Sequence, residues 1–247
     1  MTPVSRETKS SETDREAPIA PLRVAANRDT GFLPSKHGFP FANCFAHGTP
    51  VLEIGPFAIG DISRGLCGGM IYLALDYFFS RRTMPPELND KLLTELRHRL
   101  LESFDFPFGY LRYYESQWRP ERSVSFAGVT VVEGITRRTL TVEWPKVKAL
   151  LDAGSPVPLG LVQVKTYNLN PWILGSNHQV LAYMYEWIAP LGDVCLRIYD
   201  PNYPSDDTVT LTLKLDDLES GDAVIHSVDG PRVRGFFITA YRKPIVP

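Results

Sequence analysis

The sequence has 247 residues, and its 26 Lys and Arg against 28 Asp and Glu give a formal net charge of −2. A chain of this length forms one large domain or two small ones, and its balanced charge argues against a nucleic-acid binder that depends on a basic surface. The three cysteines form no CxxC pair, which excludes a four-thiolate zinc site and argues against a disulfide scaffold; they are Cys44, Cys67 and Cys195.

The N-terminal segment has the composition of a disordered tail. Residues 1–20 mix Ser, Thr, Glu, Arg and Pro without an apolar period, so ordering them would cost entropy without burying apolar surface. They contain no apolar core of a secretory signal, and the longest weakly polar run, residues 66–75, is too short to span a bilayer. We therefore expect residues 1–30 to be a disordered polar tail, residues 31–247 to form one domain, and the protein to be cytoplasmic without a membrane span.

Three helices are expected in the first two thirds of the chain. Apolar residues at spacings of three and four predict a helix over Cys67–Phe79. Leucines every four residues predict a second helix that starts at Pro85 and Pro86, since a first helical turn tolerates proline. A third helix fits Trp144–Ala153, with Gly154 as its C-terminal stop.

The second half of the chain changes to short β-branched and aromatic runs, separated by Asn, Asp, Gly and Pro clusters. A strand or hairpin is also expected within segment 123–142. Because helices come first and strands later, the sequence predicts an α+β domain with a helical part packed on an antiparallel sheet. The expected strands are 157–164, 179–187, 194–199, 208–213 and 233–241.

Cys67 lies at the expected start of the first helix, in the sequence GLCGGM. The amides of a first helical turn point outward unpaired and favour negative charge, so a thiol there ionises more readily when a histidine is near. Gly68 and Gly69 weaken a helix and are typical of places where another group approaches the backbone closely. Taken alone, one cysteine at this place is more typical of helix packing.

A histidine and an aspartate are placed to reach this thiol. His178 opens an expected strand, and Asp200 ends the next one, 22 residues later. Antiparallel strands joined by a short turn bring the start of one beside the end of the other. Asp200 would then bind one imidazole nitrogen while the other faces Cys67, which is the nucleophile–base–orienter arrangement that activates a thiol.

Three short motifs in chain order carry a family resemblance: GLCGGM at a helix start, NHQVLAY opening a strand and IYDPN closing the next. Together they resemble the papain-like cysteine peptidase superfamily, and within it the bacteriocin-processing peptidase-like branch more than papain itself. The resemblance implies a papain-like fold in which Cys67 is the nucleophile, His178 the general base and Asp200 the orienting acid. It implies no metal or organic cofactor.

The sequence departs from the papain pattern around the nucleophile. No aromatic residue directly follows the cysteine, and Asp61 occupies the position where papain-like enzymes place a Gln that donates to the oxyanion. Asn43 in FANCF is our preferred replacement donor, although an Asn in such a loop is more often a turn former. Asn177 and Gln117 are the alternatives, and the backbone amide of Cys67 would be the second donor.

The expected activity is acyl transfer through a thiol, and it leaves three interpretations open. Release of the acyl group to water gives a peptidase or amidase acting on a peptide, acyl or amide substrate. Release to an amine or alcohol gives an acyltransferase or a transglutaminase-like enzyme. Asp61 at the oxyanion position favours a third interpretation, a binding protein that keeps the fold without turnover. The oligomeric state is not determined by the sequence.

The remaining two cysteines lie outside this arrangement. His37 and His47 flank Cys44, but no second pair of ligands accompanies them, so a structural zinc site is not expected. Cys195 lies in an apolar expected strand, where packing is the ordinary role.

Four further polar residues carry weaker signals. His98 lies among arginines on the leucine-rich helix and is expected on its solvated face, whereas His226 lies in a late loop with no identifiable partner. Asp206 and Asp207 follow the DPNYP turn and compete with Asp200 for the orienting role, but they lie past the end of the strand.

Aromatic residues suggest the walls of a groove. One group precedes a proline turn, and residues 167–172 form the loop that leads to His178. Such side chains could hold an extended peptide or acyl chain, although core packing accounts for any one of them as well. The first group comprises Tyr110, Tyr113, Tyr114 and Trp118.

Overall fold

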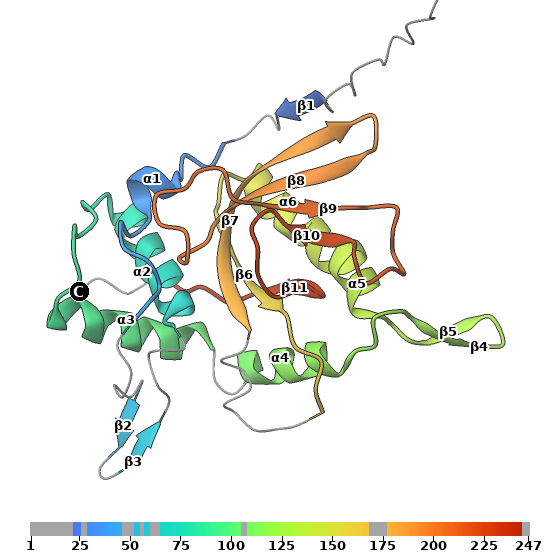
Figure 1. Ribbon diagram of the computed structural model, residues 1–247, viewed down its shortest axis with the longest axis horizontal. Coiled ribbons are helices and arrows are strands. Elements are labelled where there is room, and N and C mark those ends of the chain that lie inside the picture. Colours follow the sequence, from blue (N-terminus) through green and yellow to red (C-terminus); the bar gives the residue numbers. More distant parts are fainter. Residues whose placement is uncertain are drawn as a thin grey trace, which may run out of the picture.

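The computed structural model describes residues 22–25, 29–45, 52–54, 57–59, 65–104, 108–167 and 177–243 (Figure 1). The helices are α1 (Pro34–His37), α2 (Cys67–Ser80), α3 (Asp90–Ser103), α4 (Phe108–Trp118), α5 (Ile135–Arg138) and α6 (Trp144–Asp152), with a π-helical turn over Thr139–Glu143. The strands are β1 (Leu22–Ala25), β2 (Leu52–Ile54), β3 (Phe57–Ile59), β4 (Val124–Phe126), β5 (Val129–Val132), β6 (Val157–Val162), β7 (His178–Ala189), β8 (Asp193–Tyr199), β9 (Thr210–Leu213), β10 (Val224–His226) and β11 (Gly235–Ile238).

One antiparallel sheet forms the centre of the molecule. Its strands follow the order β10-β9-β8-β7-β6-β11, and β1 joins the far end of β7 (Figure 1). β7 is the longest strand: β6 pairs with its first half, β8 pairs along its length, and β1 pairs with its last four residues. The expected α+β class with an antiparallel sheet is confirmed.

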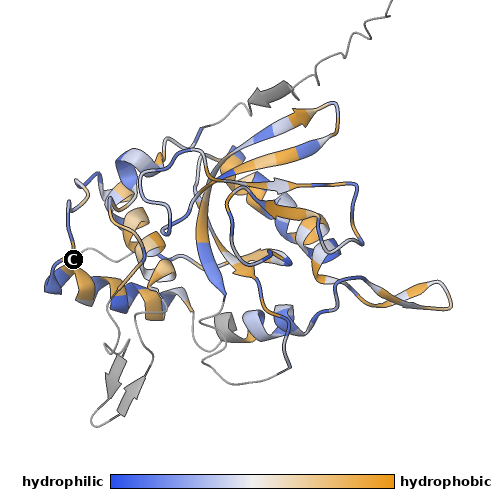
Figure 2. Ribbon diagram, in the orientation of Figure 1, coloured by the Kyte–Doolittle hydropathy of each residue, from blue (hydrophilic) through white to orange (hydrophobic). Residues whose placement is uncertain are grey.

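Helices cover both faces of this sheet. Leu181 and Tyr183 of β7 pack into the core that α2 and α3 share, whereas Val180 and Ala182 pack into the core that includes α6. The alternation along β7 therefore divides the apolar residues between two cores, as the two-residue period of a strand requires. Figure 2 shows apolar residues along the helices and the strands of the central sheet that form these two cores.

The expected strands of the second half are confirmed with shifted ends, and so are two of the expected helices. α2 begins at Cys67, and α6 ends just before Gly154, whose positive φ of 78° follows the last turn. The predicted start of α3 was wrong: the helix begins at Asp90 and not at Pro85, because the Asn89 side chain caps it by accepting from the Leu92 amide at 2.9 Å.

Segment 123–142 divides into two structures, so the expectation of a strand or hairpin is right only for its first half. β4 and β5 form a hairpin through Ala127 and Gly128, both with positive φ. The remainder, from Ile135, is helical and continues into α6, because Ile135 and Leu140 pack into the cores. Propensity alone did not indicate this helix.

α4, β10 and β1 are among the elements that were not anticipated. α4 carries the aromatic group that the sequence assigns to a groove, and β10 carries a residue assigned to a loop, His226. Residues 22–25 lie in the expected tail, yet they form β1, since their backbone pairs with residues 186–189 of β7. Residues 1–21 lie outside the described residues.

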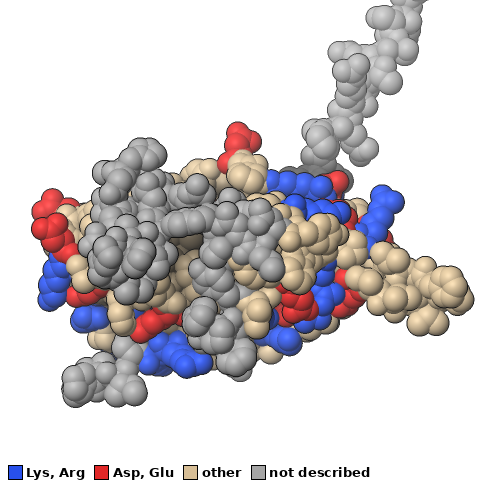
Figure 3. All heavy atoms as spheres, turned by 90° about the horizontal axis from the view of Figure 1, so that it is seen from below, with Lys and Arg blue, Asp and Glu red and all other residues tan. Residues whose placement is uncertain are grey.

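The β4–β5 hairpin projects from the body of the molecule (Figure 1). Its side chains are exposed on both faces, with Phe126 at 78 % of its full exposure. The hairpin carries no charged residue, and Figure 3 shows it as an uncharged extension beside a body on which acidic and basic groups alternate. No helix among the described residues is long and apolar enough to cross a membrane.

The two glycines after Cys67 allow close packing around α2. A Cβ on Gly69 would collide with the carbonyl oxygen of Leu96 in α3, and a Cβ on Gly68 would collide with the Ser103 hydroxyl and lie 2.8 Å from Gln179 Oε1. The expectation of a close approach is therefore confirmed at both positions.

Replacing Gly69 with Ala should destabilise the protein by roughly 1–3 kcal/mol, because the added methyl group pushes α2 away from the α3 backbone. In an open helix the same change would stabilise by about 1 kcal/mol, so the sign is diagnostic. Denaturant unfolding measures it. Gly230→Ala is the control, since a Cβ there meets nothing within 4 Å. A Gly69→Ala variant as stable as wild type would contradict this packing.

Candidate functional site

The hairpin of β7 and β8 brings His178 and Asp200 together. His178 is the first residue of β7, Asp200 follows the last residue of β8, and Leu181 pairs with Tyr199 between them. His178 Nε2 lies 2.7 Å from Asp200 Oδ1, and the two residues are 8 % and 1 % exposed. The juxtaposition expected from two strands joined by a short turn is confirmed.

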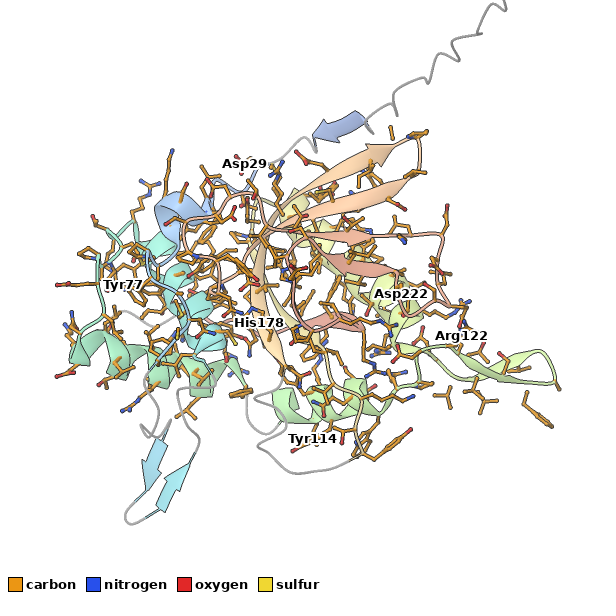
Figure 4. The ribbon with its side chains drawn as sticks, in the orientation of Figure 1. Asp29, Tyr77, Tyr114, Arg122, His178 and Asp222 are labelled. Carbon is orange, nitrogen blue, oxygen red and sulfur yellow. The ribbon has the colours of Figure 1, made fainter. Side chains whose placement is uncertain are left out.

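Cys67 completes the arrangement from the helical layer. It is the first residue of α2, which packs on β7, and its side chain lies close enough to His178 to raise the pKa of the imidazole. Because Nε2 of His178 is held by Asp200, Nδ1 is the ring nitrogen that remains to serve the thiol. Figure 4 places His178 where the α2 layer meets the sheet. The structure therefore brings the three expected residues to one place.

Charge stabilises the imidazolium form of His178. Burial opposes that form, but the Asp200 carboxylate, through its charge and its hydrogen bond, and the contact with Cys67 outweigh burial and raise the pKa of His178 to about 10. Burial likewise opposes ionisation of Asp200, yet His178 and the Asn202 amide, which donates to Oδ1 at 2.8 Å, lower the pKa of Asp200. The pair is thus held as an imidazolium facing a carboxylate.

Asn43 joins the chain before α2 to the turn after Asp200. Its Oδ1 accepts from the Leu66 amide at 2.5 Å, and its Nδ2 donates to Asn202 Oδ1 at 3.1 Å. Its own amide donates to the carbonyl of Pro201 at 2.9 Å. Asn43 is therefore next to the nucleophile helix, and its role as an oxyanion donor stays a prediction.

The two alternative oxyanion donors, Asn177 and Gln117, have different surroundings from Asn43. Asn177 Oδ1 accepts from the Gln163 amide at 3.1 Å, which turns its carbonyl toward β6. Gln117 lies on α4 with its side-chain amide fully buried and without a hydrogen-bond partner among the described residues. Asp61, at the position of the papain-like Gln, lies outside the described residues.

A polar cluster lies against the first turn of the nucleophile helix. Gln179 Nε2 donates to the Ser103 hydroxyl at 3.3 Å, and Gln179 lies near enough to the Tyr113 hydroxyl to affect its pKa. Tyr113 is close enough to Cys67 for their charges to interact, although it is fully buried, and burial raises its pKa well above the usual value. This cluster packs against the start of α2, and no pattern in the sequence indicated it.

The expectation that aromatic residues form groove walls is wrong for the buried members of the group. Tyr113 and Tyr114 pack with Ile135, Val162 and Phe237 in a core of their own. Trp118 and Tyr167 are exposed. Residues 168–172 and the side chain of Tyr110 lie outside the described part of the structure.

One residue of the site was missed. His226 was expected in a loop without a partner, but it is the last residue of β10, and its Nε2 lies 3.5 Å from Asp200 Oδ2. The available signal was the short β-branched run before it, AVIH, which is typical of a strand.

The residues that might have competed with the site are placed apart from it. Asp207 accepts from the amide and hydroxyl of Ser35, and Asp206 accepts from Thr208, so neither replaces Asp200. His98 is exposed on α3, as expected.

The cysteines and histidines considered for metal binding have other surroundings. His37 Nδ1 accepts from the Leu33 amide at 2.9 Å, Cys44 is exposed, and Cys195 is buried in β8, where packing was expected. Within the described ranges, no group of three His, Cys, Asp or Glu side chains gathers as metal ligands would. His47 lies outside those ranges.

Comparisons with known proteins give no match. No family model matches the chain, and neither a curated protein nor a solved structure does.

The His178–Asp200 pair predicts how stability depends on pH. Since the pKa of His178 rises from 6.5 to about 10 on folding, its stabilisation is complete below pH 6.5 and is lost as the pH rises through about 10. Between these limits we expect wild type to lose roughly 5 kcal/mol more unfolding free energy than His178→Gln, which cannot titrate. Denaturant unfolding at a series of pH values measures both slopes. Parallel slopes would show that the pair does not stabilise the fold.

Proposed function

We propose that the protein is a thiol-dependent hydrolase, a peptidase or amidase, that works through an acyl-enzyme on Cys67. The observation that carries this proposal is that His178 is hydrogen-bonded to Asp200 and lies close enough to Cys67 for the cysteine to raise its pKa. A nucleophile, a base in contact with it and a third group that orients the base are the parts that thiol-based acyl transfer requires.

The proposed reaction uses only side chains of this site. The sulfur of the Cys67 thiolate attacks the carbonyl carbon of the substrate, and the His178 imidazolium gives its Nδ1 proton to the leaving amine. His178, now neutral, takes a proton from water as the water oxygen bonds to the acyl carbon. The carbon–sulfur bond then breaks, which releases the acyl group as an acid and restores the thiolate–imidazolium pair. Asp200 keeps Nε2 protonated and the ring oriented throughout.

A papain-like fold is part of the same proposal. Its support is the chain order Cys, His, Asp, with the cysteine at the N-terminus of a helix and the other two on neighbouring antiparallel strands. The N-terminus of α2, whose first amides lie beside Cys67, favours the negative charge of the thiolate. The substrate we propose is a peptide or another acyl or amide compound, and this chemistry requires no cofactor.

Alkylation by iodoacetamide at pH 6 tests the activated thiol. Only a thiolate reacts, so we expect Cys67 to be modified at least tenfold faster than Cys44, although Cys44 is the more exposed of the two. Mass spectrometry of peptides measures each site. His178→Gln should remove the advantage of Cys67 and leave Cys44 unchanged, since the imidazolium that stabilises the thiolate is gone.

Equal rates at Cys67 and Cys44 in folded wild type would overturn the proposed mechanism. Acyl probes of peptide, ester and glutamine type then test turnover, with Cys67→Ser as the control that should not be labelled. Release of the captured acyl group to water identifies a hydrolase, whereas release to an added amine identifies an acyltransferase or a transglutaminase-like enzyme. A reactive Cys67 that captures no acyl group would favour a binding protein.

Two substitutions of Asn43 separate its possible roles. Asn43→Asp keeps an oxygen that accepts from the Leu66 amide but removes the Nδ2 donor, and Asn43→Ala removes both. If Nδ2 donates to the oxyanion, both variants should slow turnover of an acyl probe about a hundredfold while alkylation of Cys67 stays within a few-fold of wild type. A fully active Asn43→Asp would limit Asn43 to anchoring the start of α2.

A further inference from the structure

The second carboxylate oxygen of Asp200 faces another histidine. Oδ1 is occupied by His178 and the Asn202 amide, whereas Oδ2 lies 3.5 Å from Nε2 of His226. The His226 side chain is 11 % exposed, and that of Asp200 is 1 % exposed. A nearly buried carboxylate thus lies between two imidazoles that come from different strands, β7 and β10.

The two facing atoms have no other partner in the described part of the chain. Asp200 Oδ2 and His226 Nε2 are both buried and neither makes a hydrogen bond there. At 3.5 Å they are within ion-pair range but just beyond good hydrogen-bond geometry. Since leaving a buried polar atom unpaired is costly, each atom is the natural partner of the other.

The charges around His226 are few. Burial lowers the pKa of His226, Asp200 opposes that shift and the charge of His178 adds to it, so the net effect favours the neutral imidazole of His226. β9, which pairs with β10, carries no charged residue over Thr210–Leu213. A neutral imidazole has one N–H to donate, and the carboxylate requires that this proton be on Nε2.

We propose that His226 is a positioning residue whose Nε2–H holds Oδ2 of Asp200, so that Oδ1 stays directed at His178. The role of His226 in catalysis rests on the proposed function, whereas its contact with Asp200 is independent of that function. Without His226, no described donor would face Oδ2. The carboxylate would then be less readily ionised and the imidazolium of His178 less strongly stabilised.

The tautomer of His226 in wild type is the first test. Nitrogen NMR of the imidazole rings at pH 7 should show the proton of His226 on Nε2. A proton on Nδ1, which would leave a bare Nε2 against the carboxylate, overturns the proposal. This measurement needs no variant and no substrate.

Two substitutions of His226 form the second test. His226→Phe fills the space without a donor, and we expect the pKa of His178 to fall by about one unit and alkylation of Cys67 at pH 6 to slow about tenfold. His226→Gln, whose amide can reach as Nε2 does, should restore both values to near wild type. In an Asp200→Asn background His226→Phe should change neither quantity further.

A folded His226→Phe with an unchanged His178 pKa and an unchanged alkylation profile would overturn the positioning role. A lower melting temperature without these shifts would also overturn it, since it would indicate only a packing role. Failure of the proposed function is separate, because Cys67 would then capture no acyl probe in wild type. The tautomer and the His178 titration would still report on His226 in that case.

Discussion

The site and the sheet depend on one buried carboxylate, that of Asp200. A carboxylate with 1 % exposure costs several kcal/mol unless donors and an opposite charge replace its water. His178 at the start of β7 and the Asn202 amide in the turn after β8 supply donors to one oxygen, and His226 of β10 faces the other. Because these groups come from separate segments, Asp200 constrains the start of one strand, the end of its neighbour and a third strand together.

A second constraint brings the thiol to this carboxylate. α2 reaches β7 only because Gly68 and Gly69 let Ser103, Gln179 and the backbone of α3 approach its first turn. Any larger side chain at either glycine would move the helix that carries the nucleophile. The glycines that are poor for helix propensity are therefore required by packing, and packing decides where the thiol lies.

Local signals in the sequence were sufficient for much of the fold and failed where distant contacts decide. Apolar periodicity found α2, and short β-branched and aromatic runs found most strands of the sheet, which is covered on both faces. The sequence offers two possible starts for α3, at Pro85 and Pro86 or after Asn89. The helix starts after Asn89 because its side chain accepts from the Leu92 amide, which a proline side chain cannot do. The helix from Ile135 was missed because its β-branched residues favour strands, and only packing against the sheet makes it helical.

The same distinction applies to the site. Cys67, His178 and Asp200 were predictable because a helix start and one hairpin place them, and a hairpin brings its ends together by local geometry. His226 was not, because the chain must leave Asp200, form β9 and return along β10 before the histidine faces the carboxylate. No spacing in the sequence encodes that return. An unpaired carboxylate oxygen in the interior costs free energy, so a buried carboxylate favours a partner even when that partner comes from a strand that is distant in the sequence.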